Sequence, residues 1–105
     1  MLIQVTTDSS IPQDGRLTQE VESAVRDTMQ RFERQVTRVV VHLSDVDGDV
    51  RSGPDDKRCR LEVRIAGHEP ITVSHYASSV EQCVSGATGK LSRSLDRVFE
   101  LWSDR

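Results

Sequence analysis

The chain has 105 residues, enough for one domain, and a net charge of −3 with 35% hydrophobic and only 4% aromatic residues. Its longest uninterrupted apolar run is Val39-Val40-Val41, whereas a membrane-spanning helix needs about 20 apolar residues. The N-terminus "MLIQVTTDSS" also lacks the basic region and long apolar stretch of a secretory signal. We therefore expect a small soluble domain with an aliphatic core, located in the cytoplasm.

The first third of the chain predicts a strand, a turn and a helix. Residues 2–7, "LIQVTT", are rich in β-forming residues, and "SSIPQDG" after them is a turn-forming connection. Apolar residues then recur in steps of three and four, which predicts an amphipathic helix from residue 17 to about Thr37. The stripe consists of Leu17, Val21, Val25, Met29, Phe32 and Val36.

Three further strands are predicted in the middle of the chain. Residues 38–44, "RVVVHLS", are β-branched, and residues 57–65, "KRCRLEVRI", alternate between apolar and charged side chains. This alternation is typical of a strand with one buried and one wet face. After a tight turn at "AGHEP", residues 71–75, "ITVSH", form the fourth strand, with Ile71 and Val73 facing inward.

The last third predicts a long helix that opens with a capping box formed by Ser78 and Glu81. Because both helices have one apolar stripe and the sheet one apolar face, the most economical packing places both helices on one side of the sheet. The sequence therefore predicts an α+β fold: a two-layer β-α-β-β-β-α sandwich with a four-stranded sheet. The second stripe consists of Val80, Val84, Ala87, Leu91, Leu95, Val98 and Trp102.

The negative charge of the chain is concentrated in one segment. Residues 45–56, "DVDGDVRSGPDD", hold five aspartates and one arginine, and their Gly and Pro content predicts a mobile acidic loop over residues 45–57. An EF-hand calcium loop would need glycine and glutamate where Val50 and Asp56 stand. We therefore expect no metal there, and a single domain over residues 1–105.

Cations gather on one side of the last helix. At about 100° per residue, Lys90, Arg93 and Arg97 fall within roughly 60° of one another and point outward. Gly86 and Gly89 lie on or near the same side, which would suit a closely approaching partner, packing between the helices, or simple tolerance. The first helix and its end carry a second cationic group, Arg31, Arg34 and Arg38. Charge spacing alone favours an ordinary solvated face.

The order β-α-β-β-β-α resembles the ribosome hibernation-promoting factor family, which includes the ribosome-associated inhibitor A proteins. The resemblance rests on "RFERQVTRVVVHLS", "RCRLEVRIAGHEPITVSH" and the K-L-x-R-x-L-x-R pattern within "GATGKLSRSLDR". The chain departs from the family in having less basic helix faces, "SSVEQ" where an aspartate and a tyrosine are common, and a long acidic loop.

The resemblance implies a fold similar to double-stranded-RNA-binding domains and a role in silencing translation during stress or stationary phase. It implies binding to rRNA of the small ribosomal subunit, in the channel for messenger and transfer RNA. The chain ends soon after Trp102 and resembles the short members, without a dimerisation domain. We expect a monomer when free, with no membrane partner. The implied RNA-binding residues are Lys90, Arg93, Arg97, Arg31, Arg34 and Arg38.

The sequence offers no arrangement typical of catalysis. There is no P-loop, no His-x-x-x-His and no Cys-x-x-Cys, so we expect no enzyme, cofactor, small-molecule substrate or structural zinc. Cys59 and Cys83 are expected to be free, packed thiols, with Cys83 toward the flank of the last helix. One alternative remains, a regulatory protein-binding module of the same fold that uses the acidic loop or the open sheet face.

Overall fold

The computed structural model describes residues 1–8, 11, 14–45 and 56–103, of which 101–103 by backbone alone. The predicted order of elements is confirmed, with a short 3-10 helix added after the first α-helix. The elements are β1 (Leu2–Thr7), α1 (Gly15–Met29), η1 (Gln30–Phe32), β2 (Val36–Asp45), β3 (Lys57–Ile65), β4 (Ile71–Ala77) and α2 (Val80–Ser103).

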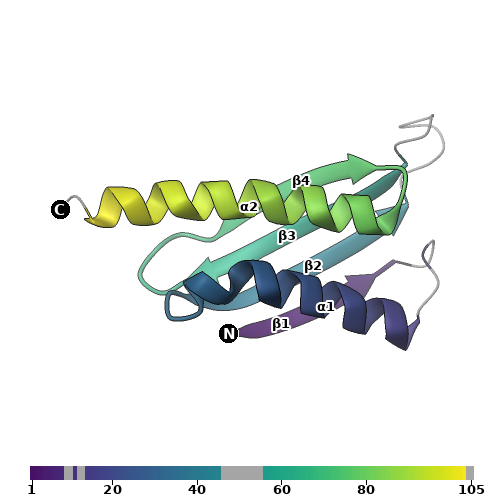
Figure 1. Ribbon diagram of the computed structural model, residues 1–105, viewed down its shortest axis with the longest axis horizontal. Helices are drawn as coiled ribbons and strands as arrows, with labels where there is room; N and C mark the ends of the chain where they lie inside the picture. Colours follow the sequence, from purple (N-terminus) through teal and green to yellow (C-terminus); the bar gives the residue numbers. More distant parts are fainter. Residues whose placement is uncertain (9–10, 12–13, 46–55, 104–105) are drawn as a thin grey trace.

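The four strands form one sheet in the order β1-β2-β3-β4. Strands β2, β3 and β4 are antiparallel neighbours, whereas β1 pairs with β2 in parallel. A parallel pair needs a crossover connection, and α1 provides it. Both helices lie on the same face of the sheet, with α2 over β3 and β4 and α1 on the β1 side (Figure 1). The predicted two-layer α+β sandwich is therefore confirmed.

The core fills the space between the sheet and the helices. In β3, Cys59, Leu61, Val63 and Ile65 are buried, while the intervening charged residues stay on the other face. The helices contribute their apolar stripes, including Val25 and Met29 from α1 and Leu91 and Leu95 from α2. Burial of this kind stabilises by about 25 cal/mol per Å² of apolar surface, so both stripes hold the layers together.

The prediction that the first helix runs to Thr37 is wrong. Helix α1 ends at Met29, η1 continues to Phe32, and a turn bond from the Gln35 amide to the Phe32 carbonyl follows at 3.0 Å. Val36 already belongs to β2, where a register shift lies between Val36 and Arg38. Val36 lies four residues after Phe32 and is buried as Phe32 is, so a buried strand residue continued the helical spacing of the stripe.

The start of α2 also differs by one residue from the prediction. The Ser79 hydroxyl accepts a hydrogen bond from the Gln82 amide at 3.1 Å, so Ser79 is the N-cap. Ser78 instead donates to the Gln82 side chain at 2.9 Å, and the predicted Ser78–Glu81 capping box is wrong. The choice between adjacent serines depends on where β4 ends, at Ala77.

The predicted acidic loop lies almost wholly outside the described residues, because 46–55 are not described. Its two ends are described and meet directly. Asp45 and Lys57 are paired across β2 and β3, and their side chains are 3.0 Å apart. Hydrogen bonds with Asp45 and with Asp56 raise the pKa of Lys57. In the described part of the chain, neither helix combines the length and apolar character needed to cross a membrane.

Candidate nucleic-acid interface

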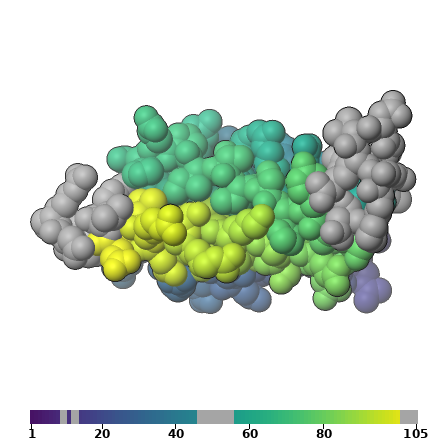
Figure 2. Space-filling view, turned by 90° about the horizontal axis from the view of Figure 1, so that it is seen from above, coloured from purple at the N-terminus to yellow at the C-terminus, as the bar shows by residue number. Residues whose placement is uncertain are grey.

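The three cations of the last helix, Lys90, Arg93 and Arg97, are exposed along one side of α2, here called the basic flank. The Lys90 ammonium donates to the Ser74 carbonyl of β4 at 2.9 Å, so this flank borders the free edge of the sheet. Viewed from the β4 side, α2 lies directly beside the strands at the surface (Figure 2). Among the described residues, no carboxylate lies within salt-bridge distance of Arg93 or Arg97.

The reason for glycine in the basic flank differs at its two positions. A Cβ atom at Gly86 would overlap the His75 ring, which lies against the helix from β4. Gly86 therefore serves helix–strand packing, which was not among the reasons considered from sequence. Gly89 has more space, since an added Cβ would meet only the Arg93 guanidinium, at 3.5 Å.

Arg31 of the second cationic group is occupied by contacts with α2. Its guanidinium pairs with both carboxylate oxygens of Asp96 and donates to the Ser92 hydroxyl at 2.7 Å. It also lies 4.2 Å from the centre of the Phe32 ring. The hydrogen bond from Arg31 holds the pKa of Asp96 below its ordinary value, and the same bond raises the pKa of Arg31. Arg31 therefore joins the end of α1 to α2 and offers the solvent a largely neutralised pair.

Arg34 and Arg38 do not lie on one helix face, because the helix ends before them. Arg34 is exposed in the turn between η1 and β2. Arg38 is on β2, and its guanidinium donates to the Gln4 side chain of β1, with an Nε–Oε1 distance of 3.0 Å. Arg38 thus belongs to the face of the sheet opposite the helices, and the six predicted residues do not form a single surface.

The charge of the helical layer is balanced overall. Residues 15–34 hold four arginines and four acidic residues, and residues 80–100 hold three cations and three acidic residues. Two of the arginines pair with a glutamate four positions away, Arg16 with Glu20 and Arg26 with Glu22. Among the described residues, the helical-layer cations without an ion-pair partner are therefore those of the basic flank and Arg34.

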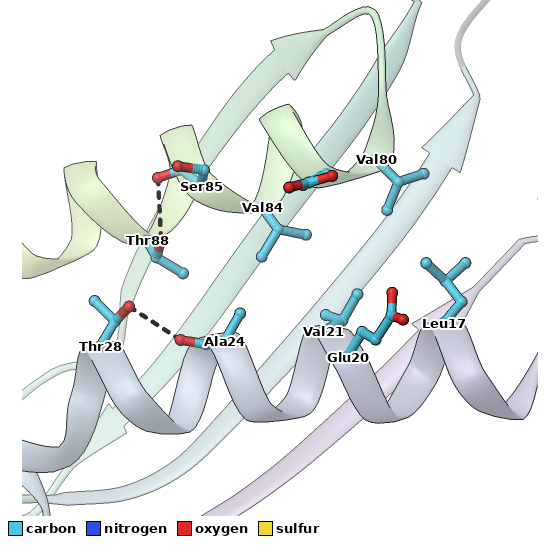
Figure 3. A pocket seen from close by; sticks show the side chains of 10 residues that line it. Leu17, Glu20, Val21, Ala24, Thr28, Val80, Val84, Ser85 and Thr88 are labelled. Atoms are coloured by element: carbon cyan, nitrogen blue, oxygen red, sulfur yellow. Dashed lines mark hydrogen bonds between the residues drawn. The ribbon is translucent and has the colours of Figure 1, made fainter.

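A groove of about 410 Å³ runs between α1 and the N-terminal part of α2 (Figure 3). Five of its ten lining residues are aliphatic, and the polar ones include Glu20 and Glu81. The hydroxyls of Thr28 and Thr88 donate to carbonyls of their own helices, both at 3.0 Å. These local bonds leave the groove without a converging set of polar groups, and its two carboxylates disfavour nucleic acid.

Other reactive side chains of the described residues are dispersed or buried. No three His, Cys, Asp or Glu side chains within these residues are grouped to hold a metal ion. Cys59 and Cys83 form no disulfide within the described residues and are fully buried, so the expected position of Cys83 at the flank is wrong. The Cys83 thiol donates to the Lys57 carbonyl at 2.8 Å. Burial raises the pKa of Cys59 to about 12, which keeps this thiol protonated and unreactive.

A parallel β-α-β unit followed by two antiparallel strands and a C-terminal helix, with cations along that helix, defines a small α+β domain. The chain belongs to the sigma 54 modulation protein / S30EA ribosomal protein family, whose model matches residues 13–100. Members of this family are non-enzymatic ribosome-binding factors that act in ribosome hibernation and translation regulation. The resemblance noted in the sequence is therefore confirmed.

Solved structures share the fold at low sequence identity. The N-terminal domain of Thermus thermophilus Protein Y superimposes with a TM-score of 0.73 at 16% identity, covering 93% of this chain and 99% of that one. A ribosomal subunit interface protein from Coxiella burnetii gives a TM-score of 0.71 at 14% identity, covering 95% and 99%. None of the curated proteins matches the sequence significantly.

Proposed function

We propose that this protein binds the rRNA of the small ribosomal subunit through the basic flank of α2, with Arg34 as a neighbouring contact. By occupying the channel for messenger and transfer RNA it silences translation in the cytoplasm without turnover. The observation that carries this proposal is the basic flank itself. In this member of a ribosome-associated family, Arg93 and Arg97 are exposed and have no carboxylate partner among the described residues.

Phosphate is the partner that this flank suits. Arginine guanidinium groups match the geometry of phosphate oxygens, and neutralised phosphates release counterions. The net charge of −3 does not argue against RNA binding, because it describes the whole chain, whereas contact with phosphate depends on the local electric field at the basic flank. Arg31 contributes less to the proposed interface than the resemblance implied, because Asp96 already neutralises it.

Co-sedimentation with purified small subunits over a range of salt concentrations tests the proposal. The triple change Lys90→Glu, Arg93→Glu and Arg97→Glu should sharply weaken binding and reduce the log–log salt slope by about 2 to 3. Stability should change little, as surface substitutions usually stay within about 0.5 kcal/mol each. Of the three changes, Lys90→Glu is the one expected to lower stability most, because it removes the hydrogen bond from Lys90 to the Ser74 carbonyl.

The control reverses Glu20 and Glu22 on α1 to lysine, which breaks only exposed helix pairs. This variant should bind as well as the wild type or slightly better. The proposal fails if the folded triple variant keeps the wild-type affinity and salt slope. The alternative of a regulatory protein-binding module would then move ahead.

A further inference from the structure

The face of the sheet opposite the helices, here called the open sheet face, collects arginines from two strands. Alternation along β3 turns Arg58, Arg60 and Arg64 away from the buried residues between them. The pairing of β2 with β3 sets Arg38 directly opposite Arg64. In Figure 2 this side of the molecule, at the top, has no helix over it.

The open sheet face is where the described part of the chain concentrates positive charge. Its four arginines are accompanied by one carboxylate, Glu62, whereas the helical layer is balanced. Like charges directly opposite each other on a sheet are destabilising. The Arg38–Arg64 pair therefore costs stability, and stability alone does not explain it.

The arginines of this face are incompletely satisfied within the described residues. Arg60 pairs with Glu62, and this bond lowers the pKa of Glu62. Arg58 and Arg64 have no ion-pair partner among these residues. The Nε atoms of Arg58 and Arg60 are shielded from solvent and have no hydrogen-bond acceptor there. Because the protein itself covers these two Nε atoms, they are out of reach of a partner. The charge that an anionic partner would neutralise is that of Arg58 and Arg64, which no described carboxylate pairs with.

We propose that the open sheet face is a second RNA-binding surface, in which Arg58, Arg60 and Arg64, with Arg38 beside them, contact the ribose–phosphate backbone. Alternate residues on a strand are about 7 Å apart, comparable with successive phosphates of one nucleic-acid strand. The sheet presents guanidinium forks, which recognise phosphate more specifically than ammonium groups do. The identity of this RNA as rRNA rests on the proposed function; the phosphate contact does not.

This surface changes how the protein would sit on its target. The basic flank of α2 and the open sheet face lie on different sides of the β4 edge. An RNA-lined channel would then be contacted by both layers of the sandwich, which would wedge the protein between two RNA walls. Each wall would add its own phosphate contacts to the salt dependence.

The test variant is Arg58→Gln with Arg64→Gln, which removes the two arginines of β3 that have no ion-pair partner among the described residues. Binding is measured to purified small subunits and, by fluorescence anisotropy, to fluorescein-labelled polyuridylate and to a labelled RNA duplex. We expect at least a tenfold loss of affinity for small subunits and for one RNA probe. The log–log salt slope should fall by about 1.4 to 1.8, since each phosphate contact contributes about 0.7 to 0.9.

Two control variants separate charge position from net charge and from packing. Gln19→Glu with Ser23→Glu changes the net charge by the same −2 on the exposed face of α1, and it should leave affinity within about twofold. Arg58→Lys with Arg64→Lys keeps the charge and the long stems, and it should keep most of the salt slope. Thermal unfolding confirms that all variants are folded.

The outcomes separate this inference from the proposed function. If the helix triple variant weakens subunit binding but the folded Arg58→Gln/Arg64→Gln variant does not, the proposed function stands and the second surface is overturned. If the wild type binds the RNA probes but no subunits, and the sheet variant weakens that binding, the second surface stands and the proposed function fails. If a photo-crosslinker at position 64 captures only ribosomal proteins on the subunit, the second surface is overturned in favour of a protein contact.

Discussion

Gly86 is the residue where a single missing side chain decides the packing of a whole element. The His75 ring from β4 occupies the space that a Cβ would take. Glycine in a helix interior costs about 1 kcal/mol relative to alanine. The close contact with His75, together with the Lys90–Ser74 bond one turn further along, places α2 tightly against the edge strand.

Gly86→Ala should therefore destabilise the protein although it raises helix propensity. Overpacking of a close contact typically costs about 1 to 3 kcal/mol, which exceeds the propensity gain. Urea unfolding followed by circular dichroism measures the difference. Gly89→Ala is the matched control: it meets only the movable Arg93 side chain and should gain up to about 1 kcal/mol.

The double variant His75→Ala/Gly86→Ala tests whether overlap with the His75 ring is the reason why Gly86→Ala destabilises the protein. Once the ring is absent, Gly86→Ala should stabilise relative to His75→Ala alone, so the two changes couple strongly. A Gly86→Ala protein at least as stable as the wild type would show that the ring moves away at no cost.

Cys59 yields a prediction about pH. Its folded pKa of about 12 lies above the ordinary value near 8.5, so the unfolded chain loses the thiol proton first as the pH rises. The stability linked to Cys59 is complete below about pH 8.5 and is lost as the pH rises toward 12. Between pH 8 and 10.5 the urea midpoint of the wild type should fall more than that of Cys59→Ala, and equal slopes would contradict the assignment.

At the scale of elements, Arg31 acts as a clamp between η1 and α2. It pairs with Asp96 while Phe32 and Phe99 stack beside it with ring centres 5.6 Å apart. The clamp joins residues 65 positions apart, and no local pattern in the sequence reveals such a contact. This is why sequence analysis grouped Arg31 with freely available cations.

Asp96→Asn should lower the melting temperature modestly, because the pair is exposed and screened by salt. Asp96 has a lowered pKa in the folded state. Its contribution is therefore present above about pH 3.9 and lost as the pH falls through the lowered folded value. The melting temperatures of the wild type and of Asp96→Asn should become equal in acid and at high salt. A difference in melting temperature that persists under both conditions would indicate a packing effect.

The same variant tests how Arg31 relates to the proposed interface. Asp96→Asn releases the Arg31 guanidinium next to α2, so binding to small subunits should tighten and the salt slope should steepen by up to about 0.9. Ser92→Ala is the control, since it removes one hydrogen bond of Arg31 but leaves the ion pair. Unchanged binding by Asp96→Asn would place Arg31 outside the interface.

Element types were predictable because each apolar stripe has a clear period, and β3 was predicted with its observed bounds. The end of α1 was not, because Val36, a residue of β2, lies four residues after Phe32 and so continues the helical spacing. That error carried into the site: a helix running to Thr37 placed Arg38 beside Arg34, whereas the strand turns Arg38 to the opposite layer. The exposure of Arg93 and Arg97 was predicted correctly from the apolar stripe of α2, because exposure depends on where a residue lies around the helix relative to that stripe.

At the scale of the whole molecule, charge is separated by region. The helical layer is neutral and the open sheet face is positive. Residues 46–56 carry four aspartates and one arginine, which equals the entire net charge of −3. A polyanionic target would be attracted to the open sheet face and the basic flank, and repelled by this one segment.

The last prediction removes that segment. Since Asp45 and Lys57 face each other across the sheet, Asn-Gly in place of residues 46–56 can close a two-residue hairpin between them. The free energy of unfolding should change by no more than about 1 kcal/mol, because closure entropy depends weakly on loop length. The variant, now with zero net charge, should associate faster with small subunits at low salt, and stopped-flow fluorescence would measure this. Slower association or weaker binding would contradict this prediction and would mean that residues 46–56 contact the ribosome.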